Sequence, residues 1–140
     1  MNMFPGSAQR RLYICTSTRN MAAYHRLQQA LELSRYEVLD WARFLPAPGP
    51  DFDRLKNEDP QGAAFAYCSR ALGSADLVVY IGPSGCDASA ELGIAFAAGV
   101  PVWGVLGPGE QPGVMIKGCV TRWFPNLDAL VEKLTRWRGW

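Results

Sequence analysis

Residues 75–102, ADLVVYIGPSGCDASAELGIAFAAGVPV, place a strand, a helix and a second strand in direct succession. Residues 76–81 are apolar after the initial aspartate, which is typical of a strand that is covered on both faces. Residues 87–98 predict a helix that Gly99 ends, and residues 100–106 predict the next strand. A strand, helix and strand in this order predict a parallel βαβ unit with a right-handed crossover.

The same alternation extends in both directions from this unit. Further strands are expected at residues 12–15, 36–41 and 119–124, further helices at 21–33, 61–72 and 127–136, and Pro- and Gly-rich loops at 45–60 and 107–113. The pattern predicts an α/β fold: one doubly wound, flavodoxin-like parallel sheet of about five strands in the order 2-1-3-4-5. We expect a flexible leader over residues 1–10 and a single domain over residues 11–140.

Composition excludes several classes of protein. The chain has 140 residues, of which 49% are hydrophobic and 19% charged, so it is not a disordered chain. The net charge of +1 argues against a partner that is a nucleic acid polymer. The longest apolar stretch is too short and too interrupted to cross a bilayer, so we expect no membrane partner and a cytoplasmic location.

Cysteine and histidine usage predicts neither a metal site nor a disulfide framework. The four cysteines, Cys15, Cys68, Cys86 and Cys119, show no CxxC spacing, and the chain has a single histidine. We therefore expect no metal and no cofactor.

Two loops are selected as the ligand site by the fold alone. In doubly wound sheets, ligands bind beyond the carboxyl ends of the strands, at the point where the strand order reverses. Here that point lies between the first and third strands, which predicts a site formed by residues 16–20 and 82–91.

Glu91 is the unusual residue of the helix over 87–98, because apart from Ser89 its neighbours between Ala88 and Ala98 are apolar or glycine. Asp87 lies four residues earlier on the same face, and like charges at that spacing cost a few tenths of a kcal/mol. Asp87 has an ordinary structural explanation as a first-turn acid, in a capping box with Ser84. Glu91 lies too far along the helix to cap it, so it is either solvated or ion-paired, or it is functional. A carboxylate there could stabilise the cationic anomeric carbon of a sugar during glycosyl transfer.

Residues 75–102 resemble the signature of the nucleoside 2-deoxyribosyltransferase family and the related nucleotide N-glycosidases, in which E-L-G-x-A follows a hydrophobic strand and a glycine-containing loop. LYICTSTRN, residues 12–20, is similar to the first strand and loop of that family. The resemblance covers about 90 residues, from Leu12 to Leu106, with strong matches in these two blocks. It implies a deoxyribosyltransferase or N-glycosidase acting on a nucleoside or nucleoside monophosphate, in a chain that assembles as a homo-oligomer.

The resemblance also implies roles for individual residues. Glu91 matches the catalytic glutamate that attacks C1′, and Tyr13 matches the tyrosine that orients this glutamate. The remaining matches are to substrate-binding loops and comprise Thr16, Ser17, Thr18, Arg19 and Asn20 after the first strand, and Ser84, Gly85 and Asp87 before the helix. The guanidinium of Arg19 is suited to receiving a phosphate.

The chain departs from the family pattern at two positions. Cys68 stands where the family has an aspartate that assists departure of the base, and Gly85 stands where many members have Asp or Ser. A thiol does not replace a carboxylate in proton transfer without strong activation, so Asp87 or Asp59 would have to substitute. Two other functions therefore remain open: a nucleotide-binding sensor that does not cleave its ligand, and a flavodoxin-like electron carrier.

Overall fold

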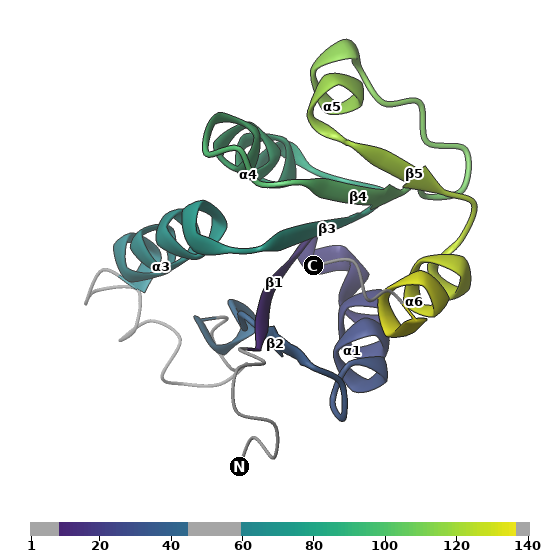
Figure 1. The fold of residues 1–140 in the computed structure, drawn as a ribbon. Coiled ribbons are helices and arrows are strands. Elements are labelled where there is room, and N and C mark those ends of the chain that lie inside the picture. Colours follow the sequence, from purple (N-terminus) through teal and green to yellow (C-terminus); the bar gives the residue numbers. More distant parts are fainter. Residues whose placement is uncertain (1–8, 45–59, 137–140) are drawn as a thin grey trace.

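The computed structural model describes residues 9–44 and 60–136, and its centre is one five-stranded parallel sheet (Figure 1). The strands are β1 (Arg10–Thr16), β2 (Tyr36–Val38), β3 (Leu77–Ile81), β4 (Val102–Val105) and β5 (Arg122–Phe124). Their order is β2-β1-β3-β4-β5, and all four pairings are parallel. The α/β fold class and the strand order predicted from the sequence are confirmed.

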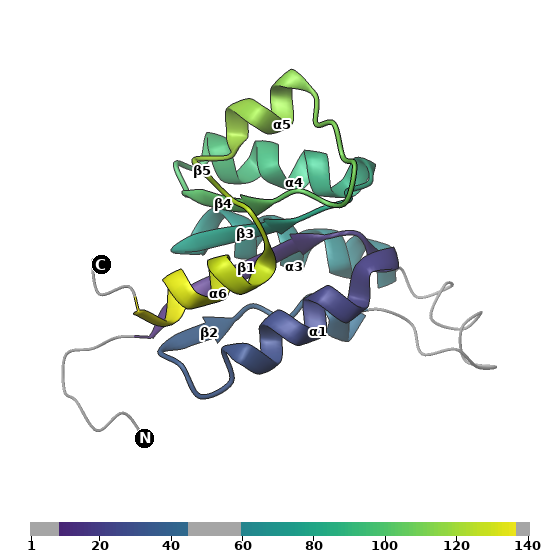
Figure 2. The ribbon, with the colours of Figure 1, turned by 90° about the vertical axis from the view of Figure 1, so that its right-hand side faces the viewer.

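Helices cover both faces of this sheet. They are α1 (Met21–Ala30), α3 (Pro60–Ser74), α4 (Cys86–Ala97), α5 (Val114–Cys119) and α6 (Leu127–Arg136), with short 3₁₀ turns η1 (Thr18–Asn20) and η2 (Ala42–Phe44). α3, α4 and α5 lie on one face, and α1 and α6 lie on the other (Figures 1 and 2). Among the described residues, no helix has the length and apolar character needed to cross a membrane.

The register of β1 decides which of its side chains face α3 and α4. Tyr13 pairs with Val78 of β3 and Cys15 pairs with Tyr80, so these residues share one face of the sheet. The Cys15 thiol donates a hydrogen bond to the carbonyl of Ala88 in α4, over 3.4 Å, which identifies that face as the one covered by α4. Leu12 and Ile14 point to the opposite face, and both are fully buried.

Several element boundaries differ from the sequence predictions. β1 begins at Arg10, the last residue of the expected leader, and residues 1–8 lie outside the described part of the chain. α1 ends at Ala30 and β2 at Val38, both earlier than expected, whereas α3 continues through Gly73 to Ser74. Of the expected loop at 45–60, residues 45–59 lie outside the described residues, as does the candidate acid Asp59, and Pro60 begins α3.

The short helix α5 was not predicted. Its residues Val114–Cys119 fall between an expected loop and an expected strand, and Cys119 closes the helix instead of opening β5. Six residues are too few for a helical period to stand out in the sequence, and so short a helix depends on tertiary packing for its stability. That packing is provided by α4, which lies beside it (Figure 1).

Gly104 occupies a position on β4 where a side chain does not fit. It pairs with Tyr80 of β3 and Trp123 of β5, and the rings of these two residues meet edge to face across it, with centroids 6.1 Å apart. A Cβ atom at Gly104 would lie 2.8 Å from Cζ3 and 2.9 Å from Cε3 of Trp123. The glycine therefore allows the aromatic contact that joins the last three strands.

Replacement of two glycines by alanine should have opposite effects on stability. Gly104→Ala forces the Trp123 ring to move and should destabilise the protein by about 1–3 kcal/mol. Gly93→Ala, in the exposed middle of α4 with open space around the added methyl, should stabilise it by about 0.5–1 kcal/mol. Urea unfolding of both variants and the wild type measures the free energy of unfolding. Equal changes in that free energy for the two variants would contradict the described packing of β4.

Candidate functional site

The carboxyl ends of β1 and β3 are joined by side-chain hydrogen bonds. The hydroxyl of Thr16 donates to the carbonyl of Ile81 over 2.6 Å. Asn20 donates through Nδ2 to the carbonyl of Gly82 over 3.1 Å and to the Thr16 hydroxyl over 3.3 Å. The loop after β1 is thereby fixed to the loop after β3, at the point where the strand order reverses.

Glu91 lies at the centre of this edge. Its side chain projects from α4 toward β1 and α3, where the Oε2 atom is buried without a hydrogen-bond partner. The hydroxyl of Tyr13, a residue with no exposed surface, is likewise buried and without a partner. Buried polar groups in folded proteins are normally paired, so these two oxygens, which lie near enough to shift each other's pKa, mark a candidate functional site.

The electrostatic surroundings of Glu91 raise its pKa from the ordinary 4.5 to about 7. Burial of the carboxylate is the largest cause, and the negative charge of Asp87 adds to it. The Tyr13 hydroxyl and the Cys15 thiol lie near enough to stabilise the ionised form and oppose part of this rise in pKa. At neutral pH the carboxyl group is therefore poised between its two protonation states.

The thiol of Cys68, on α3, lies near the Tyr13 hydroxyl and the Glu91 carboxylate. Burial, together with the carboxylates of Glu91 and Asp87, raises the pKa of the Cys68 thiol above its usual value, while the Tyr13 hydroxyl opposes this. The thiol is therefore protonated at neutral pH and contributes a weak donor instead of a charge.

Two clefts meet at Glu91. One, of about 460 Å³, opens toward the loop after β1. The other, of about 560 Å³, runs between α3 and α4 and is lined largely by apolar side chains, including Phe65 and Ile94. The side chains common to both are Ala64, Cys68, Asp87 and Glu91. Glu91 therefore borders both clefts.

The structure brings most of the sequence-predicted site residues together. Those that line the 460 Å³ cleft are Thr16, Ser17, Thr18, Arg19, Gly85, Asp87 and Glu91. Asn20 serves to join the two loops and is not among the lining residues, whereas Tyr13 lies buried next to Glu91.

Ser84 lies on a separate, neighbouring cleft of about 450 Å³, whose other wall is the loop after β4. Glu110 holds this loop by accepting hydrogen bonds from the amide of Gly107 over 2.9 Å and from the hydroxyl of Tyr80 over 2.5 Å. The expected capping box is absent, because Gly85 is the N-cap of α4 and no side chain caps the helix. Asp87 is thus an exposed acid in the first turn.

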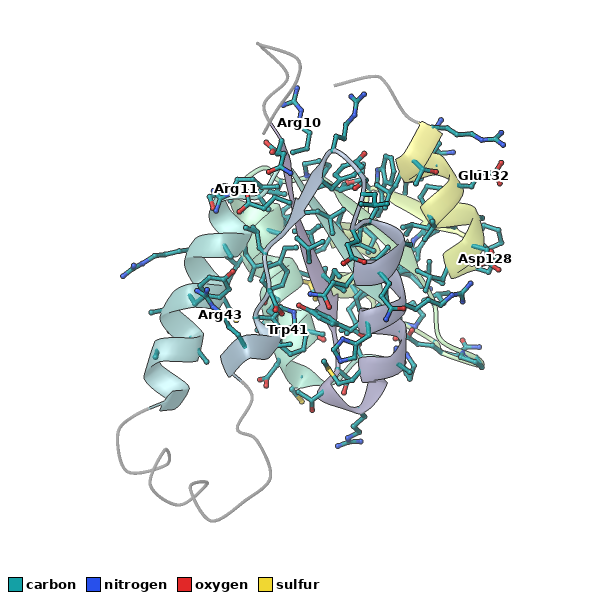
Figure 3. The ribbon with its side chains drawn as sticks, turned by 90° about the horizontal axis from the view of Figure 1, so that it is seen from below. Arg10, Arg11, Trp41, Arg43, Asp128 and Glu132 are labelled. Carbon is teal, nitrogen blue, oxygen red and sulfur yellow. The ribbon has the colours of Figure 1, made fainter. Side chains whose placement is uncertain are left out.

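Trp41 is a lining residue that the sequence reasoning missed. It follows β2 at the same edge of the sheet, and its indole nitrogen donates to the carbonyl of Ile14 over 2.6 Å. Nearby, Arg43 lies over the ring of Tyr67 in α3, 4.4 Å from its centroid, which joins η2 to that helix (Figure 3). The position of Trp41 at the end of a strand that borders β1 was the available signal, because strand ends on this edge meet the ligand.

No protein-family model and no curated protein sequence matches the chain. Solved structures do match it. A 2-deoxyribosyltransferase from the psychrotolerant bacterium Bacillus psychrosaccharolyticus is similar over 92% of this chain and 93% of its own, with 16% identity and a TM-score of 0.68. A CMP N-glycosidase from Clostridium botulinum is similar over 89% and 98%, with 17% identity and a TM-score of 0.61.

A conserved protein from Enterococcus faecalis is similar over 91% of this chain and 98% of its own, with 16% identity and a TM-score of 0.63. The fold implied by the sequence resemblance is therefore confirmed.

Replacement of Glu91 by glutamine should change how stability depends on pH. Because the pKa of Glu91 is raised to about 7, the folded protein holds this proton more tightly than the unfolded chain, and its stability falls as pH rises from about 4.5 to 7. Glu91→Gln cannot ionise and should match the wild type near pH 4.5, then exceed it by roughly 1–3 kcal/mol at pH 8. Urea unfolding across this range measures the difference. A constant difference would mean that the Glu91 carboxylate is solvated.

Proposed function

We propose that the protein is a nucleoside 2-deoxyribosyltransferase-like N-glycosidase. It would cleave or transfer the N-glycosidic bond of a nucleoside, deoxynucleoside or nucleoside monophosphate, with Glu91 as nucleophile. The observation that carries this proposal is the pair of buried, unpaired oxygens, Oε2 of Glu91 and the hydroxyl of Tyr13, together with the position of Glu91 on the border of two clefts. The fold shared with a 2-deoxyribosyltransferase and a CMP N-glycosidase supports it.

The proposed reaction has two steps at C1′. A carboxylate oxygen of Glu91 attacks C1′, and the bond from C1′ to the base nitrogen breaks with its electron pair leaving on that nitrogen. The nitrogen takes a proton from water in the open cleft. Water or a second base then attacks C1′, loses a proton and frees the carboxylate. With water the reaction is hydrolysis, and with a second base it is transfer.

Tyr13 is the residue placed to orient the nucleophile. Burial and the nearby Glu91 carboxylate raise the pKa of its hydroxyl well above the ordinary value, so it remains a neutral donor throughout the working pH range. As a donor it stabilises the ionised carboxylate that the attack requires. Because Tyr13 stands in the buried part of β1, its side chain is already ordered before a ligand binds.

Cys68 favours a second candidate function, a nucleotide-binding sensor with the same site. Its thiol lies beside Tyr13 and Glu91 and is protonated at neutral pH, so it offers no second carboxylate at that position. Among the described residues lining the clefts, Asp87 is the remaining carboxylate besides Glu91, and it is exposed. A sensor would use the clefts to hold the ligand without breaking its bond.

We further propose that the chain forms a homo-oligomer through α3 and α4. Phe65 on α3 is 70% exposed and Phe96 on α4 is 62% exposed, on helices that pack side by side (Figure 1). Exposed aromatic side chains near an apolar cleft are typical of a protein interface. The free thiols Cys15, Cys68, Cys86 and Cys119 suit a reducing compartment, which is consistent with the cytoplasm.

Loss of the Glu91 carboxylate should abolish base release. We expect the wild type to liberate free base from at least one member of a panel of deoxynucleosides and their 5′-monophosphates. Glu91→Ala should lower kcat/KM by at least about 10³-fold, and Tyr13→Phe by about 10- to 100-fold, because each removes a group from the reacting centre. Chromatography of the released base measures this.

The matched control for this experiment is Glu37→Gln, which neutralises an exposed glutamate on β2, away from the clefts. It should release base at the wild-type rate. Ligand binding by the wild type without release would favour the sensor, and full activity in Glu91→Ala would refute the proposed nucleophile.

A charged substitution on the α3–α4 face should weaken self-association. Phe65→Glu removes exposed apolar area and adds repelling charges across a symmetric interface. The dissociation constant of the homo-oligomer should therefore rise by at least about tenfold in this variant. Sedimentation velocity over a concentration series measures this. Leu33→Glu, which alters a fully exposed side chain after α1, is the control, and a monomeric wild type would contradict the proposal.

A further inference from the structure

The two clefts at Glu91 carry more negative than positive charge. Asp87 and Glu91 line both of them, and among the described lining residues Arg19 is the single basic side chain, present in the 460 Å³ cleft alone. With Glu91 ionised, two carboxylates therefore face one guanidinium in that cleft. In the other cleft they face no described cation.

The N-terminus of α4 contributes little to an anion site, although its geometry would otherwise favour one. The helix has twelve residues, and its N-cap, Gly85, leaves the first amide groups without a side-chain acceptor. Such an end ordinarily attracts phosphate. Here Asp87 stands in the first turn and supplies the negative charge that complements the positive end of the helix.

Asp87 and Glu91 are one helical turn apart on the same face of α4, which places their Cβ atoms about 5–6 Å apart. The negative charge of Asp87 raises the pKa of Glu91. In the proposed reaction, C1′ of the ligand lies at the Glu91 carboxylate. A 5′-phosphate, a few bonds from C1′, would have to share this cleft with the Asp87 carboxylate.

We propose that Asp87 is a specificity-determining residue that rejects phosphorylated substrates, so that the substrate is an uncharged nucleoside. This inference rests on the proposed function and narrows it. A phosphate dianion about 6 Å from a carboxylate in water is disfavoured by roughly tenfold. Arg19 opposes this only in part, because with Asp87 and Glu91 both ionised this cleft has two carboxylates for its one described guanidinium.

The test compares kcat/KM for the four 2′-deoxynucleosides with kcat/KM for their 5′-monophosphates, at pH 8 and low salt. The wild type should prefer the nucleosides by at least about tenfold. Asp87→Asn keeps the shape of the side chain and removes its charge, and it should reduce that preference by about tenfold. Asp87→Glu restores the charge and should restore the preference, which a merely structural role of Asp87 would not produce.

Asp128→Asn is the matched control, because Asp128 is an exposed carboxylate on α6, on the opposite face of the sheet (Figures 1 and 3). It should leave the preference unchanged. A wild type that prefers monophosphates, or an Asp87→Asn preference equal to that of the wild type, would overturn the inference while leaving the glycosidase intact.

If no substrate is cleaved, the proposed function fails, and calorimetric binding of thymidine and thymidine monophosphate decides the inference instead. Tighter binding of thymidine by the wild type, with the difference lost in Asp87→Asn, would support it. Tighter binding of the monophosphate, or no binding of either, would overturn it.

Discussion

The burial of one carboxylate, that of Glu91, is the constraint to which the rest of the site responds. Water would hydrate this group far better than the space between α3, α4 and β1 does, and the loss of hydration is the main cause of its raised pKa. Oε2 gains no regular hydrogen bond in return. Such a group lowers the stability of the folded chain at neutral pH, so a fold selected for stability alone would have replaced it with an apolar residue.

The parallel sheet makes this burial possible. Because side chains alternate along β1, Tyr13 and Cys15 lie on the same face of the sheet, the face that α4 covers. There each helps to stabilise the ionised carboxylate of Glu91. The hydrogen bonds of Thr16 then fix β1 to the end of β3. The register of β1 therefore sets the position of the Tyr13 hydroxyl and the Cys15 thiol relative to Glu91. Groups held on strands keep their geometry more closely than groups on loops.

Much of this arrangement could be predicted from the sequence, and the parts that could not share a physical cause. The buried strand over 77–81 and the glutamate in an otherwise apolar helix are local patterns, so they predicted the fold and the central residue of the site. Trp41 and Cys15 were missed because their place at the site depends on contacts between segments far apart in the sequence, and the predicted strand order did not say which side chains make those contacts. The short helix α5 was missed for the same reason, since its packing on α4 stabilises it.

The thiol of Cys68 changes the charge balance beside Glu91. A second carboxylate at this position would face Glu91 across the Tyr13 hydroxyl, and two neighbouring carboxylates cannot both ionise cheaply. The thiol avoids that repulsion, so it leaves Glu91 easier to ionise than a carboxylate would, but it gives up a proton donor for the departing base. Under the proposed function, the site therefore has Glu91 to attack C1′ and no carboxyl group at position 68 to assist departure of the base. We propose that such a site suits substrates whose base leaves without help from an acid. That requirement would concern the base, whereas the proposed selection by the Asp87 charge would concern the 5′ end of the sugar.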